Sequence, residues 1–166
     1  MNLSTAKLVS TTVSSPKLDL IQATWSHIAE RYLKRIENNR ILTGRVRSIR
    51  LLAVHDAIHS VIDPGNGHIY REISEGSTIE AAYAATVKAS HDVLAAVFTD
   101  AGDREDLADH LEESLALIGK EDEKEAGIFS GADSATSYIR SFALLIVNRG
   151  ATRRNAFRHS RDLAAA

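Results

Sequence analysis

Apolar residues recur at spacings of three and four along most of the chain, which is the period of amphipathic helices. The pattern is broken by clusters of Gly, Pro, Asn and Asp that are typical of turns. It predicts helices from Ser15 to about Glu37, from Thr43 to Ile62, from Ile79 to Phe98, from Asp103 to Gly119, and from about Ile128 to Asn148. We therefore predict an all-α fold, an antiparallel bundle of about five helices joined by short loops.

The ends of the chain lack this periodicity. Residues 1–14 are rich in Ser and Thr and are expected to form a flexible arm, and residues 151–166 are expected to form a basic, poorly ordered tail. The helical bundle domain is then predicted to span residues 15–150.

The second helix is apolar on every side from Ile49 onward, where the other helices have one apolar stripe. A helix that is apolar all round is typical of a buried helix. We therefore predict that the segment Arg45–Ile62 is the most buried part of the bundle. Its polar residues His55, Asp56 and His59 would then need hydrogen-bond partners in the interior.

Local signals refine these predictions. The segment Ser77-Thr78-Ile79-Glu80 has the pattern of a capping box, and Asp103 is a candidate cap of the fourth helix. Gly127 and Gly131 lie one turn apart and would permit a close helix crossing. The fourth helix is acidic, so we expect it to pair with three arginines of the second helix, namely Arg45, Arg47 and Arg50.

Composition excludes several classes of function. The chain of 166 residues contains no cysteine, which excludes disulfides, thiolate zinc sites and cysteine nucleophiles. Its net charge is −2, and its charge is uneven: the stretch Arg31–Arg50 is basic and Asp100–Glu125 is acidic. This pattern fits helix surfaces that pair with one another better than a nucleic-acid partner. No apolar run is long enough for a membrane span and no secretory signal is visible, so a cytoplasmic location is the default expectation.

The segment His55-Asp56-Ala57-Ile58-His59 is the main candidate for chemistry. Its two histidines lie one turn apart, as metal ligands often do, but no third ligand is evident in the sequence. One alternative is therefore a metal-dependent phosphohydrolase of the His-Asp type that uses His55, Asp56 and His59. Another is a helical interaction module without enzymatic activity.

The order of several segments resembles a known family. These segments are Trp25 in the first helix, Arg45–Ala57 with its His-Asp-Ala ending, the turn at Asp63-Pro64, the helix from Glu80 to Phe98, and Ala126–Gly131 leading to Asn148-Arg149-Gly150. Together they resemble the N-terminal helical half of vanadium-dependent haloperoxidase-like proteins, in the type 2 phosphatidic-acid phosphatase superfamily. The resemblance covers about Leu18 to Gly150.

What the resemblance implies is a scaffold without the catalytic residues. The family holds vanadate or phosphate in its C-terminal bundle, through a Lys, an Arg-Pro pair, a Ser-Gly-His segment and an Arg followed by His. This chain has no Arg-Pro and no Ser-Gly-His. The resemblance therefore assigns it no catalytic or cofactor-binding residue and places vanadate or phosphate in the missing half.

The expected role is a scaffold half that is inactive alone, as a fragment or as a subunit of a split enzyme. Its expected partner is another copy of itself, as a homo-oligomer, or a second helical chain that contains the catalytic half. The helices Ile79–Phe98 and Ile128–Asn148 have broad apolar faces and are the surfaces that we expect to bind this partner.

Overall fold

A computed structural model of the protein describes residues 16–62, 78–118 and 124–141. The elements are α1 (Pro16–Leu33), the short 3-10 helix η1 (Lys34–Ile36), α2 (Arg40–Ile62), α3 (Ile79–Val97), α4 (Ala101–Ala116) and a last helix over residues 124–141. Within these ranges there are helices and no strands, so the predicted all-α class is confirmed. The predicted arm, the tail, the Asp63-Pro64 turn and the end of the last helix at Asn148 lie outside the described residues.

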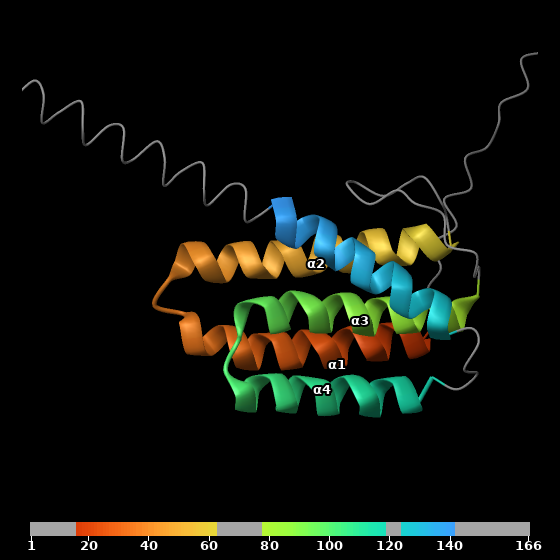
Figure 1. The fold of residues 1–166 in the computed structure, drawn as a ribbon, viewed down its shortest axis with the longest axis horizontal. Coiled ribbons are helices and arrows are strands. Elements are labelled where there is room, and N and C mark those ends of the chain that lie inside the picture. The colour runs from red at the N-terminus through yellow and green to blue at the C-terminus, as the bar shows by residue number, and fades with distance from the viewer. Residues whose placement is uncertain (1–15, 63–77, 119–123, 142–166) are drawn as a thin grey trace, which may run out of the picture.

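The helices pack around α3 (Figure 1). Consecutive helices from α1 to α4 run in opposite directions, and α2 and α4 lie at opposite edges of the stack. The helix 124–141 crosses one side of α2 and α3, whereas α1 lies on the other side of α3. As a result α3 has neighbours all around it, and α2 has an outer side that faces away from the bundle.

The most buried helix is α3, so the prediction that the Arg45–Ile62 segment is most buried was wrong. Eleven of the 19 residues of α3 are buried, against eight of the 23 residues of α2. The reason is side-chain size: five alanines of α3 are almost fully buried and allow several helices to approach its backbone, namely Ala81, Ala82, Ala84, Ala85 and Ala89. The apolar side chains of α3 are thus covered mainly by its own chain.

The outer side of α2 remains exposed although it is apolar. The side chain of Ile41 is 68% exposed, that of Leu51 52% and that of Leu52 38%. The same helix buries Val46, Ala53, Ala57 and Val61 on its inner side. A helix that is apolar all round is thus covered on one side only.

The close helix crossing predicted at Gly127 and Gly131 is confirmed. A Cβ atom at Gly127 would overlap the carbonyl oxygen of Ala81, and one at Gly131 would lie 2.7 Å from the carbonyl oxygen of Ala85. The last helix therefore packs with its backbone directly against α3. Residue 124, the first described residue of this segment, is already helical, about one turn before the predicted start.

Several helix starts differ from the sequence predictions. The side chain of Asn39 accepts a hydrogen bond from the Leu42 amide, so α2 begins before Thr43. The cap of α3 is Thr78, which accepts from the Ala81 amide at 3.2 Å, whereas Ser77 lies outside the described residues. The helix α4 follows Asp100 rather than Asp103. No helix in the described ranges combines the length and apolarity that a membrane span requires.

Candidate functional site

The predicted residue Asp56 is fully buried between α2 and the last helix. The hydroxyl of Tyr138 donates a hydrogen bond to Oδ2 of Asp56 at 2.7 Å. Beside it, Ser134 donates to the backbone oxygen of Ala53 at 2.8 Å. A buried carboxylate is costly unless it is hydrogen-bonded. Asp56 therefore helps to fix the last helix on α2.

The other two predicted residues lie nearer the surface. Nδ1 of His55 is 3.2 Å from Oδ1 of Asp56, and the rings of His55 and His59 are 4.2 Å apart between their centroids. The His55 side chain is 42% exposed. The structure thus brings all three predicted residues together. The Tyr138 hydroxyl contacts the Asp56 carboxylate, which contacts the His55 imidazole, and the His59 ring lies beside that of His55.

In this arrangement the Asp56 carboxylate is buried, whereas the His55 ring is partly exposed to solvent. Asp56 is turned into the core and can orient the His55 ring, which is the part that a carboxylate plays behind a histidine. Among the residues that the structure describes, no group of three or more His, Asp or Glu side chains could hold a metal ion.

Arg50 is a buried cation at the junction of α1, α2 and α3, with 6% of the residue exposed. Its guanidinium donates to the hydroxyl oxygen of Ser26 at 3.0 Å and to that of Ser90 at 3.3 Å, while its Nε has no hydrogen-bond partner. Burial lowers the pKa of Arg50, because a charged group loses its hydration there. Glu30 is the negative charge whose field opposes this effect.

The predicted pairing between the arginines of α2 and α4 was wrong. Arg47 pairs instead with Glu30 of α1, through two hydrogen bonds of 2.8 and 2.7 Å. The hydrogen bonds from Arg47 lower the pKa of the Glu30 carboxyl. The physical reason is position, because α2 and α4 lie on opposite edges of the bundle with α1 and α3 between them.

The partners of α4 are the basic residues at the end of α1. Arg31 pairs with Asp106 at 2.7 Å, Arg35 pairs with Asp103 at 2.5 Å, and the Tyr32 hydroxyl donates to Asp106 at 2.6 Å. Burial and the hydrogen bond to Asp106 raise the pKa of Tyr32 to about 12. These five side chains line a shallow open hollow of about 220 Å³. The sequence contains a signal for these pairs, because Arg31 and Arg35 lie four residues apart and Asp103 and Asp106 lie three apart, but it does not show which basic residues face α4.

The comparisons give no relative. No family model, curated protein or solved structure matches this chain. The resemblance to the haloperoxidase-like family therefore stays an expectation from the sequence.

Two further side chains extend the polar contacts of the bundle. Trp25 is fully buried, and its indole donates to the Ser114 hydroxyl at 3.1 Å. Asp92 lies between Lys88 and His91, each 2.7 Å away. Burial alone would raise the pKa of Asp92, but the hydrogen bonds from His91 and Lys88 outweigh it and the pKa is lowered. Both groups link neighbouring residues or helices rather than lining a cavity.

Proposed function

We propose that this chain is a non-catalytic helical scaffold that binds another helical surface through the outer face of α2. We define this face by its exposed or half-exposed side chains, which are Ile41, Ser48, Leu51, Leu52 and His55. The observation that supports the proposal is the exposure of three large apolar residues on one side of a helix. Single exposed leucines are ordinary, but neighbouring ones on one helix face are typical of a binding surface.

The shape of this face favours a helical partner. Gly44 and Ser48 lie one turn apart on the same side as Ile41, and nothing lies within 4 Å of a Cβ added at Gly44. Small residues between larger apolar ones allow a second helix to approach closely. Covering such a face yields about 25 cal/mol per Å² of apolar area, which can offset part of the entropy lost on association.

The resemblance agrees with this role. It implies a set of helices that packs against a second bundle, and its catalytic residues are absent from this sequence. The chain would then be the scaffold half of a haloperoxidase-like or phosphatase-like assembly, inactive alone, with vanadate or phosphate bound elsewhere. The His-Asp phosphohydrolase has weaker support, because the Asp56 carboxylate faces Tyr138 in the core.

The test is the double variant Leu51→Gln/Leu52→Gln, examined by sedimentation velocity. We expect the wild-type chain to associate at tens of micromolar and the variant to lose at least tenfold in affinity while its helical circular dichroism is unchanged. The matched control is Leu20→Gln, because Leu20 is 67% exposed on α1, away from this face. Equal association of all three chains, or a strictly monomeric wild type, would contradict the proposal.

The non-catalytic part of the proposal needs its own assay. The purified chain is expected to show no bromide oxidation with vanadate and peroxide, and no hydrolysis of a phosphate ester with added divalent metal. Turnover that disappears in a His55→Ala variant would overturn this part and would restore the phosphohydrolase interpretation.

A further inference from the structure

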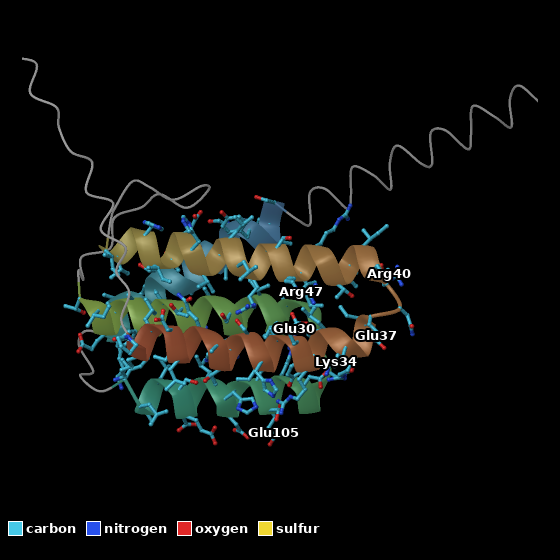
Figure 2. All side chains as sticks on the ribbon, turned by 180° about the vertical axis from the view of Figure 1, so that it is seen from behind. Glu30, Lys34, Glu37, Arg40, Arg47 and Glu105 are labelled. Atoms are coloured by element: carbon cyan, nitrogen blue, oxygen red, sulfur yellow. The ribbon has the colours of Figure 1, made fainter. Side chains whose placement is uncertain are left out.

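The two outer edges of the bundle have opposite charge. At the edge formed by α2, Arg40 and Arg45 flank the exposed Ile41, and neither forms an ion pair with a described carboxylate. At the opposite edge, α4 presents Glu105 and its neighbours to solvent. Figure 2 shows Arg40 and Glu105 near these two edges.

The acidic edge is a continuous stripe along α4. Glu105, Asp109 and Glu112 follow one another at spacings of four and three, so they lie on the same side of the helix. All three are exposed, and within the described ranges none of them forms an ion pair. Asp103 and Asp106, by contrast, are held by α1. The stripe is therefore the part of α4 whose charge the bundle itself does not neutralise.

We propose that the outer face of α2 in one copy docks on the acidic stripe of α4 in a second copy. The proposal rests on the proposed function and names its partner. Arg40 and Arg45 would lie against Glu105 and Glu112, and the apolar residues of α2 would cover the small side chains of α4. Because the two surfaces differ and lie on opposite edges of one molecule, the contact is heterologous and can repeat from copy to copy.

The charges favour this contact between α2 and α4 over a contact in which two copies meet through their α2 faces. Within the described part of α2 the only acidic residue is Asp56, which is fully buried. Two outer faces of α2 would therefore meet with arginines and no carboxylate between them. The stripe of α4 supplies those carboxylates, and complementary charge sets which surfaces meet and how strongly salt weakens the contact.

A charge-swap experiment tests the contact. One variant is Arg40→Glu/Arg45→Glu and the other is Glu105→Arg/Glu112→Arg, each studied by sedimentation velocity in 50 and 500 mM salt. We expect each variant alone to associate at least tenfold more weakly than wild type, and the two mixed together to form species that contain both. A chain with all four substitutions is expected to regain self-association. The control is Lys34→Glu/Glu37→Arg, which exchanges exposed charges between α1 and α2, outside the residues that define the two surfaces.

The outcomes separate this inference from the proposed function. If Leu51→Gln/Leu52→Gln weakens association but the α4 variant does not, the face of α2 binds something other than the stripe, and this inference is overturned while the proposed function stands. If neither variant weakens association, or if the wild type is monomeric, both are overturned. Recovery in the mixture and in the fourfold variant, with unchanged circular dichroism, supports both.

Discussion

The neighbouring helices α2 and α3 pack against each other along their length but differ in how they meet the rest of the molecule. Eleven of the 19 residues of α3 are buried, most of them small, and helices surround it. By contrast, α2 has larger apolar residues on all sides, and Leu51 and Leu52 stay exposed. Small side chains let a helix occupy the centre, whereas the large apolar residues on the outer side of α2 form the surface that we propose for a partner.

The two helices also differ in the charges that they bury. Arg50 and Asp56 are both on the buried part of α2, and each is held mainly by hydroxyl groups of other helices. The buried polar residues of α3, Thr86 and Ser90, are neutral. Of these two helices, only α2 buries charged residues, and it also has the exposed apolar face.

The largest effect is expected where the last helix touches α3. In the variant Gly127→Ala the new methyl group would overlap the Ala81 carbonyl, so the last helix must shift. We expect a loss of about 3 kcal/mol of unfolding free energy in urea denaturation. Gly44→Ala is the control on the open side of α2 and should stabilise by about 0.5–1 kcal/mol. A loss of stability at both positions would contradict the claim that α3 is closely covered while the outer side of α2 is open.

The next effect concerns the buried carboxylate of α2. Tyr138→Phe removes the hydroxyl that donates to Asp56 and should cost about 1–2 kcal/mol. In a double-mutant cycle with Asp56→Asn, the two substitutions should be coupled by about 1 kcal/mol. Additive losses would mean that this hydrogen bond does not hold the last helix on α2.

Replacing the buried arginine should have a smaller effect. In Arg50→Met an apolar chain of similar length removes a desolvated cation that has no ion-pair partner in the described residues. Such replacements are often neutral or stabilising, so we expect a change between zero and about 1 kcal/mol of added stability by thermal unfolding. Arg47→Met is the matched exposed control. A loss of more than about 2 kcal/mol in Arg50→Met would show that the guanidinium stabilises the junction.

The smallest effect is the pH dependence of the contact between α1 and α4. The hydrogen bond from Tyr32 lowers the pKa of Asp106, so its contribution is present above the unfolded value of 3.8 and is lost as the pH falls through the folded pKa. The pKa of Tyr32 is raised from 10.0 to about 12, so that contribution is present below pH 10 and is lost as the pH rises toward 12. Each should be below about 1 kcal/mol, because the Asp106 side chain is half exposed and the Tyr32 hydroxyl meets it at an open hollow. Tyr32→Phe should flatten both ends of the curve of unfolding free energy against pH, and an unchanged curve would contradict this assignment.

The helices themselves could be predicted from the sequence because their signals are local. Pro16 marks the start of α1, and the paired glycines at Gly127 and Gly131 predicted the close crossing that is observed. Apolar residues at helical spacing, such as Trp25 and Leu107, lie in the core. These features depend on a single helix or on the size of one side chain, and the sequence contains both.

The arrangement of the helices could not be predicted in the same way. The sequence shows that α2 is apolar all round, but the number of neighbours that cover it depends on topology. For the same reason the sequence predicted that α4 pairs with Arg47, whereas in the structure α4 pairs with Arg31 and Arg35. Of the candidate site, the proximity of His55 and His59 followed from helical spacing, whereas the link from Asp56 to Tyr138 joins residues 82 positions apart in the sequence.

The central claim is that the outer face of α2 is a binding surface, whereas α3 is covered by its own chain. Hydrogen–deuterium exchange at about 1 and about 100 micromolar protein tests it most directly, because protection reports which helices open locally. We predict that the amides of α3 are the most protected at both concentrations, and that protection of α2 and α4 rises with concentration. Equal protection of α2 and α3 at both concentrations, with no change in α4, would contradict the account.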